Sequence, residues 1–370
     1  IVTTPAIEPN SVETNRVYFR CTDLVLETGV TINVDNKGYG GGLGSLGQGP
    51  GAGTGAAGYG GRGGDQFPAN LGGPVYGNPA APQTPGSGGR GTHAHPGNRA
   101  GNGGGAVRIE GSGHVRVDGV ITANGGVNTS THGCSGSGGA IWITCRTFSG
   151  TNGTLRAEGR NHDKGGGGGG RIAVAYDAEA QAELPLPTVL FSARGGETMT
   201  THAHADGDIG SLFFTDRQLL GAGPLRHSGQ LFFADAPTTL MFASLTVSNG
   251  HLRLPGGIAS VSVAGDVAVQ GERGRLDLGG GDSYAVLRGP WRPVTAAPAP
   301  MTVSVDGDVA LSGGGALWLI PPPTNGVDGA EGLVLDIGGS LAVGEGSCLY
   351  PCSDPTNGAS ARIDAHDLIV

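Results

Sequence analysis

The stretch Val107-Arg-Ile-Glu-Gly-Ser-Gly-His-Val-Arg-Val-Asp-Gly-Val-Ile-Thr-Ala-Asn-Gly125 alternates apolar and polar residues in short runs separated by glycine. Alternation with a period of two is typical of β-strands that bury one face. Glycine beside Ser, Asp or Asn is typical of tight turns. The stretch therefore predicts several short strands that follow one another through turns.

The same pattern recurs along the whole chain. It is found at residues 24–35, Val261-Ser-Val-Ala-Gly-Asp-Val-Ala-Val269, Val303-Ser-Val-Asp-Gly-Asp-Val-Ala-Leu311 and Leu333-Val-Leu-Asp-Ile-Gly-Gly-Ser-Leu-Ala-Val343. Strands this short cannot bury their apolar side chains alone, so successive coils must stack. We therefore expect an all-β chain folded as a right-handed parallel β-helix. Pieces of β-sandwich, chiefly in the second half, are the alternative.

Composition supports β structure. The chain has 370 residues, of which 75 are Gly, 14% are charged and 5% are aromatic. Each interior glycine costs a helix roughly 0.5–1 kcal/mol relative to Ala, which excludes extensive helix. With a net charge of −9, the chain has no basic field for nucleic acid, and no apolar run is long enough to predict a membrane span.

Four parts are predicted. Residues 1–20 form an extended N-terminal arm, 21–177 a glycine-rich β-helix, 178–230 a junction and 231–370 a second β-rich part. Within the first β-helix, residues 38–106 are a long Gly/Pro-rich insertion. They form either a projecting loop or extended polyglycine-type segments that pack without Cβ atoms, with Tyr39, Tyr59, Phe67 and Tyr76 as anchors. The six glycines 165–170 would join that layer.

Three phrases resemble a known group of proteins: Val120-Ile-Thr-Ala-Asn-Gly-Gly, Gly138-Gly-Ala-Ile-Trp-Ile-Thr and the glycine run that leads into Arg171-Ile-Ala-Val-Ala-Tyr. They are similar to glycine-rich secreted bacterial surface proteins with a predicted parallel β-helix of the pectin-lyase-like kind. The resemblance covers roughly residues 21–177 and implies an architecture. It does not imply an activity, because surface proteins, adhesins, lyases and glycosidases share such folds.

The cysteines suit an oxidising compartment. Cys134 with Cys145, and Cys348 with Cys352, are candidate local disulfides, and Cys21 is then a free or intermolecular thiol. The first residue is Ile1 and not Met, from which we expect a secreted, processed product at the cell surface. Whether the sequence is a fragment of a longer surface protein stays open.

Candidate metal ligands lie in two polar segments. His93 and His95, and His202 with His204, each place two imidazoles on one side of an extended strand, and Asp206 and Asp208 follow the second pair. No cofactor is expected, with calcium at acidic turns as the alternative. The Asp-Gly-Asp sequences at 206–208 and 306–308 are otherwise typical of turns, and Trp142 and Trp318 are expected in the core.

The two ends of the sequence contain similar strands, which favour end-to-end self-association. The candidate subunit contacts are Asp23, Leu24, Val25, Leu26, Asp367, Leu368, Ile369 and Val370. An open strand edge and an uncovered apolar core are suited to stacking on a further copy. The predicted function is a non-enzymatic extracellular structural protein, with a filament or cell-surface layer as its assembly. A carbohydrate-binding or carbohydrate-active protein that contacts a surface glycan, or an adhesin, is the alternative.

Overall fold

The chain folds into two compact units, Ile1–Gly221 and Ala222–Val370. The computed structural model describes residues 1–5, 7–12, 15–66, 70–91, 99–126, 133–198, 206–221, 223–255, 257–279, 301–321, 331–353 and 359–370. The division lies within the segment 178–230 that the sequence assigned to a junction. The first unit extends beyond residue 177 because residues 190–192 and 211–214 add strands to its sheets.

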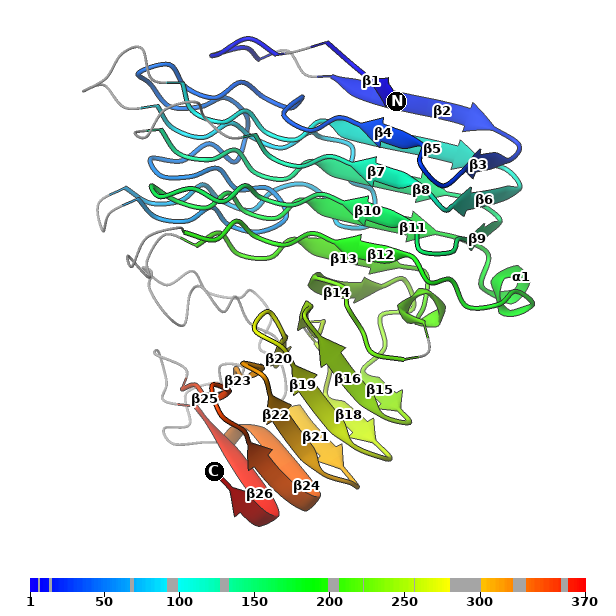
Figure 1. The fold of residues 1–370 in the computed structure, drawn as a ribbon, viewed down its shortest axis with the longest axis vertical. Helices are drawn as coiled ribbons and strands as arrows, with labels where there is room; N and C mark the ends of the chain where they lie inside the picture. The colour runs from blue at the N-terminus through cyan, green and yellow to red at the C-terminus, as the bar shows by residue number, and fades with distance from the viewer. Residues whose placement is uncertain are drawn as a thin grey trace. The chain divides into compact units, whose positions relative to one another are not determined.

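The first unit consists of three sets of parallel strands that the chain visits in turn, adding one strand to a set before it moves to the next (Figure 1). The first set is β1 (Val2–Thr3), β4 (Thr31–Asn33), β7 (Val120–Thr122), β10 (Thr154–Arg156) and β12 (Leu190–Ser192). The second set is β2 (Arg16–Cys21), β5 (Ala106–Gly111), β8 (Ala140–Thr144), β11 (Arg171–Ala175) and β13 (Ser211–Phe214). The third set is β3 (Leu24–Leu26), β6 (His114–Val117) and β9 (Thr147–Ser149).

Neighbouring strands pair in register, so that residues of the same kind lie next to one another. Val17, Val107, Ile141, Ile172 and Leu212 occupy equivalent positions on neighbouring strands of the second set, and all are buried. Each such side chain stabilises the fold by roughly 1.5–3 kcal/mol relative to an exposed one. The apolar positions of the alternating pattern therefore line the interior, and the residues between them face outward.

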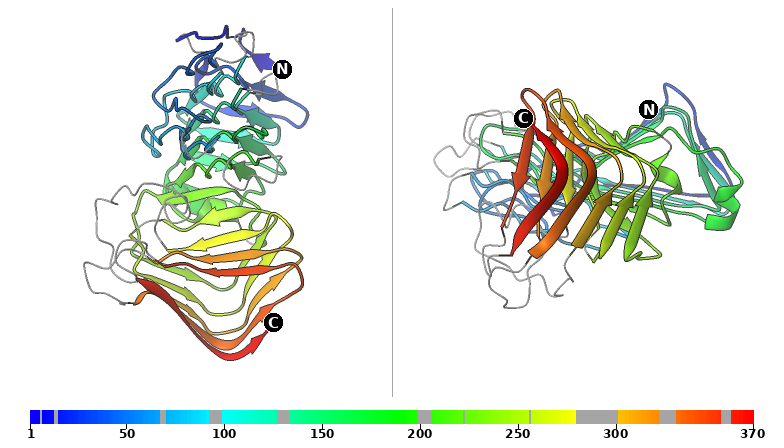
Figure 2. Two further views of the ribbon diagram at one scale, coloured as in Figure 1. Left: turned by 90° about the vertical axis from the view of Figure 1, so that its left-hand side faces the viewer. Right: turned by 90° about the horizontal axis from the view of Figure 1, so that it is seen from below.

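The second unit repeats this scheme with two sets of parallel strands. One set is β14 (Gly229–Phe233), β17 (His251–Arg253), β20 (Arg275–Leu278), β23 (Ala316–Leu319) and β25 (Cys348–Pro351). The other set is β15 (Thr239–Phe242), β16 (Leu245–Ser248), β18 (Ser260–Val263), β19 (Val267–Gln270), β21 (Met301–Val305), β22 (Val309–Ser312), β24 (Glu331–Val343) and β26 (Ser360–Ile369). The long strand β24 pairs with β21 through its first half and with β22 through its second half. Figure 2 shows these strands, coloured yellow-green to red, following one another in order.

Only two short helices occur among the described residues, α1 (Ala178–Ala182) and η1 (Gln218–Leu220). Asp177 caps α1 by accepting hydrogen bonds from the backbone N–H groups of Glu179 and Ala180. The chain is therefore all-β with parallel sheets, as the sequence predicted.

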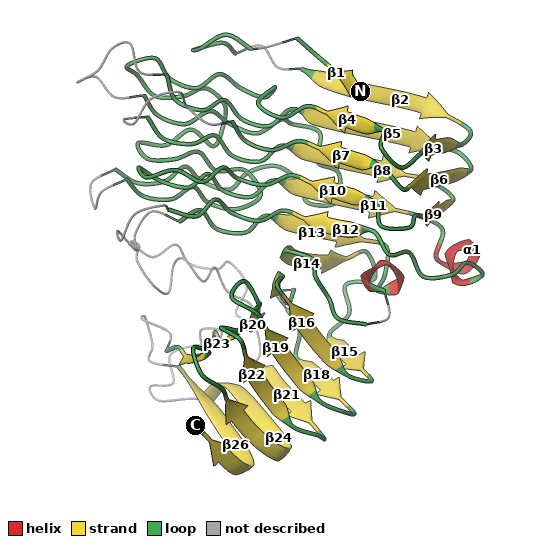
Figure 3. Ribbon diagram, viewed as in Figure 1, coloured by secondary structure: helices red, strands yellow, loops and turns green. Residues whose placement is uncertain are grey.

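Glycine-rich segments pack beside the strands of the first unit and are drawn as loops in Figure 3. They bond to one another through the backbone: Gly38 N–H donates to Gly103 O (2.7 Å), Gly104 N–H to Ser137 O (2.9 Å) and Gly138 N–H to the carbonyl of residue 168 (2.9 Å). All of these glycines are buried. Much of the described part of 38–106 is thus packed into a layer, whereas residues 74–81 are exposed or half-buried.

The packing of this layer requires glycine. A Cβ atom added to Gly138 would lie 2.2 Å from Ala157 O, and one added to Gly104 would lie 2.0 Å from Ala123 O. Backbone atoms this close cannot be displaced by a side-chain rotation. The abundance of glycine therefore has a packing reason, namely the close approach of neighbouring backbones.

The N-terminal segment, predicted as an extended arm with no core of its own, packs against the first unit. Val2–Thr3 pairs with β4, Ile7 is buried, and residues 16–20 belong to strand β2. The reason is the alternation within 16–21, which turns Val17 into the core while Arg16 and Tyr18 face outward. The segment packs on its own unit.

Candidate binding surface

The outer face of β2, β5 and β8 carries aromatic and charged side chains instead of small polar ones. Tyr18, Arg108 and Trp142 are in-register neighbours on the three strands. The Arg108 guanidinium carbon lies 4.9 Å from the centre of the Tyr18 ring and 4.4 Å from that of Trp142. The cation is thus held between two aromatic rings, an arrangement worth about 0.5–1 kcal/mol per contact at an exposed site.

A carboxylate completes this arrangement. The Tyr18 hydroxyl donates to Glu110 Oε2, and Arg108 donates to Glu110 Oε1. The hydrogen bond from Tyr18, followed by the charge of Arg108, lowers the pKa of Glu110, and the same bond raises the pKa of Tyr18. Glu110 is therefore ionised and Tyr18 neutral at pH 7.

Two further cations flank Tyr18 on β2. Arg16 and Arg20 lie two residues before and two residues after it, and all three are exposed. Within the part of the chain that the structure describes, neither arginine has an ion-pair partner. The outer face of β2, β5 and β8 therefore carries three cations and one anion, although the chain as a whole has a net charge of −9.

The sequence placed Trp142 and Trp318 in the core, and this is wrong for both. Each lies at an outward position between two buried residues, Ile141 and Ile143 for Trp142, and Leu317 and Leu319 for Trp318. Both tryptophans lie within runs of apolar residues, where residue type does not distinguish buried positions from outward ones. The face of Tyr18, Arg108 and Glu110 was missed for a related reason, since it appears only when the strands are brought into register.

The glycine-rich segment is anchored on the neighbouring part of the same sheet. Tyr59 and Tyr76 pack against each other with ring centroids 4.6 Å apart, and Tyr59 covers Ala106 and Ala140. Arg171, which is 4% exposed, donates to Tyr76 O from Nε (3.0 Å) and from Nη2 (2.7 Å). Burial raises the pKa of Tyr59 to about 12. These contacts fix the layer to the sheet, with Tyr59 and Tyr76 as the predicted anchors.

Of the other two expected anchors, Tyr39 is half-buried, with its ring close to Gly49, and Phe67 lies outside the described residues.

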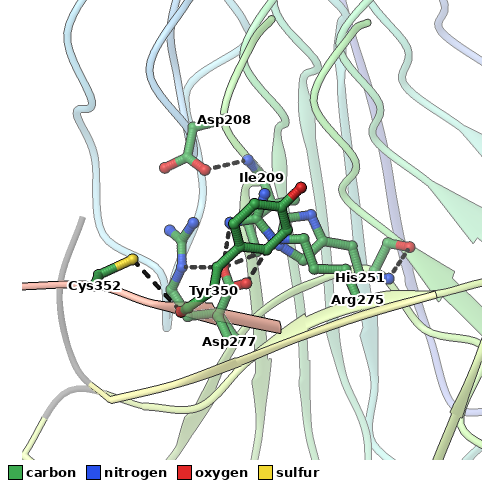
Figure 4. Close-up of polar contacts among 9 residues, drawn as sticks. Asp208, Ile209, His251, Arg275, Asp277, Tyr350 and Cys352 are labelled. Atoms are coloured by element: carbon green, nitrogen blue, oxygen red, sulfur yellow. Dashed lines mark hydrogen bonds and ion pairs between the residues drawn. The ribbon is translucent and has the colours of Figure 1, made fainter. Parts of the chain in front are cut away.

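Strands β17 and β20 of the second unit carry a buried cluster of charged residues (Figure 4). Asp277 is fully buried and accepts hydrogen bonds from His251 Nε2 (3.0 Å), Arg253 Nε (3.1 Å) and Arg275 Nε (2.6 Å). Burial opposes ionisation of Asp277, but Arg275, His251 and Arg253 outweigh it and hold its pKa below the usual range. Burial lowers the pKa of His251 to about 4, so the imidazole is neutral at pH 7 and donates its Nε2–H to the carboxylate.

An aromatic stack continues from this cluster. The Arg275 guanidinium lies 4.1 Å from the centre of the Trp318 ring, and Trp318 stacks on Tyr350 with centroids 4.2 Å apart. Both units thus hold an arginine against a tryptophan on the outer face of a parallel sheet. In the second unit, however, Arg275 is already bound to Asp277, so its charge is satisfied inside the protein.

The predicted metal ligands are not brought together in the described structure. His93, His95, His202 and His204 lie outside the described residues. Asp206 Oδ1 accepts from the backbone N–H of Thr198 (2.6 Å), and Asp208 Oδ1 from that of Ile209 (2.9 Å). Among the residues that the structure describes, no three His, Cys, Asp or Glu side chains form a metal-binding group.

The aspartates of the Asp-Gly turns connect successive strands, as the turn interpretation predicted. Asp266 Oδ1 accepts from Asp308 N (2.9 Å), and Asp308 Oδ1 accepts from Ser340 N (2.7 Å). Each carboxylate thereby satisfies a backbone donor of the next turn. The carboxylate of Asp308 is therefore used structurally.

Neither predicted disulfide is formed, and all five cysteines are free thiols. Cys134 Sγ lies in the glycine-rich layer, 3.2 Å from Lys164 O, whereas Cys145 Sγ lies 3.9 Å from Ala175 O at the end of a strand. Burial raises the pKa of both thiols to about 12. Cys348 and Cys352 are kept apart because an extended strand separates residues four apart by about 13 Å, more than a disulfide spans. Cys21 ends β2 and is half-buried.

The candidate subunit contacts lie on edge strands. Leu24–Leu26 form β3, which pairs only with β6 among the described strands, and residues 367–369 lie in β26, which pairs with β24. Leu26 is buried, whereas Val25 is 52% exposed and Leu368 is 66% exposed.

Comparison of the chain with protein families, curated proteins and solved structures finds no match. In the described part of the chain, no helix has the length and apolar character needed to cross a membrane.

Proposed function

We propose that this chain is a non-enzymatic extracellular structural protein built as a right-handed parallel β-helix and reinforced by extended polyglycine-type segments. The glycine layer carries the proposal. Its buried backbones bond directly to one another and to the strand regions, so one side of the first unit consists largely of cross-linked main chain. Such packing resists deformation because a close-packed interior has few alternative arrangements.

The buried charged residues and the turn aspartates favour a structural role. Asp277, Arg171 and the aspartates of the turns are all used in contacts that hold neighbouring strands or segments together. Deeply buried or backbone-bonded groups of this kind stabilise a fold but are not accessible to a substrate. Their placement favours a scaffold over a hydrolase or lyase.

End-to-end association is the assembly that we propose for this scaffold, and the exposed side chains of β26 favour it. Leu368 and Ile369 are 66% and 57% exposed, whereas Leu341, which neighbours Leu368 on β24, is buried. Leu368 continues the core-facing row of Leu341, and the other edge of β26 pairs with no described strand, so this edge can accept a further strand.

Electron microscopy over a range of protein concentrations tests this assembly. We expect filaments or stacked particles for the natural chain, and their loss in Leu368→Asp. Val75→Asp, which adds the same charge at an exposed position in the glycine-rich region, is the matched control and should assemble normally. Discrete particles of the natural chain at every concentration would refute end-to-end association.

A further inference from the structure

We propose that the outer face of β2, β5 and β8 binds an acidic polysaccharide, an activity that goes beyond the structural role. This surface, the strip, consists of Arg16, Tyr18, Arg20, Arg108, Glu110 and Trp142.

The excess positive charge of the strip is the first argument. Arg108 is neutralised by Glu110, whereas Arg16 and Arg20 are exposed and form no ion pair within the described structure. Arg20 lies in register with Glu110 and helps to lower its pKa, but this single carboxylate faces three arginines. A guanidinium forms its strongest hydrogen bonds with a carboxylate or sulfate group, often through two parallel N–H donors. The strip therefore offers two cations for anionic groups of a ligand.

The exposed aromatic surface is the second argument. Tyr18 is 52% exposed and lies on β2, which pairs only with β5 among the described strands. One face of its ring is covered by Arg108, and no described strand lies on the side away from β5. Its phenol is held by Glu110, so the ring is already ordered before a ligand arrives. A flat, fixed ring of this kind suits the C–H face of a sugar.

The spacing along β2 joins the two arguments. Arg16, Tyr18 and Arg20 project from the same face of one strand, so cation, ring and cation follow one another at intervals of about 6.5–7 Å. An extended polymer that carries a ring and an acidic group in each repeat can contact all three. The carboxylate of Glu110 can in addition accept hydrogen bonds from ligand hydroxyl groups.

The carboxylate of Glu110 favours a polysaccharide over a nucleic acid. The net charge of −9 opposes any polyanion, and Glu110 places an anion within the strip itself. The hydroxyl groups of a sugar can donate hydrogen bonds to this carboxylate, whereas a backbone phosphate offers only acceptors. The second unit provides a comparison, because Arg275 beside Trp318 is bound to buried Asp277 and so offers no free cation.

Binding of the whole chain to immobilised alginate, an acidic polysaccharide, and to dextran, an uncharged one, tests the proposal at low and high salt. We expect binding to alginate that weakens with salt, and at most weak binding to dextran. Arg16→Gln combined with Arg20→Gln should weaken alginate binding by roughly tenfold or more and flatten its salt dependence. Both side chains are exposed, so the double variant should fold normally.

Three further variants test whether binding depends on the strip and not on exposed arginines or tryptophans in general. Arg156→Gln removes an exposed arginine from the outer face of β10 in another sheet, and it should leave binding unchanged. Trp142→Ala should weaken binding by removing one side of the Arg108 contact, whereas Trp318→Ala should not.

Four results would overturn the proposal. Three are equal binding to dextran, an equal loss in Arg156→Gln, and binding of a single-stranded DNA oligonucleotide as tightly as alginate with the same dependence on Arg16 and Arg20. The fourth is the absence of binding to both polysaccharides, which would leave the structural role to be judged by microscopy.

Discussion

Replacing Gly138 by Ala tests whether the glycine layer is a packed part of the fold. The added Cβ would lie 2.2 Å from Ala157 O and 2.5 Å from Gly170 N, and neither backbone atom can move without moving its own segment. Overpacking of this kind costs about 1–3 kcal/mol. Separating the segments also weakens the hydrogen bonds from Gly138 N–H to Gly168 O and from Gly170 N–H to Ala157 O, which contribute about 0.5–1.5 kcal/mol each.

The opposing effect is small. Alanine reduces the conformational freedom of the unfolded chain, which stabilises the protein by about 0.4–1 kcal/mol. The net expectation is a loss of roughly 3 kcal/mol, equivalent to a fall in Tm of about 6–12 °C for a unit of this size.

Urea and thermal unfolding of the full chain, followed by circular dichroism, measure this change. Gly344→Ala is the control, because its added Cβ would meet one backbone atom at 3.0 Å and the next only at 3.8 Å. We expect that variant to change stability by less than about 1 kcal/mol. A Gly138→Ala protein as stable as the Gly344→Ala control would refute the packed layer.

Three other perturbations follow from the contacts described above. Arg171→Met removes both donors to Tyr76 O and should lower the free energy of unfolding of the first unit by about 3 kcal/mol, measured in urea. An unchanged free energy of unfolding would mean that the glycine segment is anchored elsewhere. Asp277→Asn removes the carboxylate charge that faces Arg253 and Arg275 and should destabilise the second unit by about 3–5 kcal/mol. An unchanged urea midpoint would contradict this prediction. The pKa of His251 is lowered to about 4 in the folded state, so the unfolded chain binds this proton more readily. The free energy of unfolding should therefore fall as the pH drops from about 6.5 to 4. His251→Gln should abolish that part of the pH dependence.

The period of two in the sequence predicted much of the fold. Val107, Ile109, Val115 and Val117 are buried as the alternation requires, and the repeated phrases at 261–269 and 303–311 are neighbouring strands in exact register. The alternation is informative here because most strands bury one face. It also holds within 16–21, where Val17 is buried and Phe19 half-buried, although the sequence assigns residues 1–20 to an extended arm.

The candidate surface could not be predicted in the same way. Tyr18, Arg108 and Trp142 lie far apart in the sequence and become neighbours only through the register of β2, β5 and β8. The insertion of residues 38–105 between the first two circuits removes any fixed spacing from which that register could be counted. The cluster around Asp277 was hidden because Arg275 and Asp277 have the alternation of an exposed strand face, although Asp277 is fully buried.

Amide hydrogen exchange of the glycine-rich segments tests the central claim most directly. If residues 99–105, 133–139 and 165–170 are cross-linked by backbone hydrogen bonds, their amides should exchange as slowly as those of strands β5, β8 and β11 in the same unit. Exchange of these glycine segments at the rate of an unstructured chain, while the strands stay protected, would contradict the account.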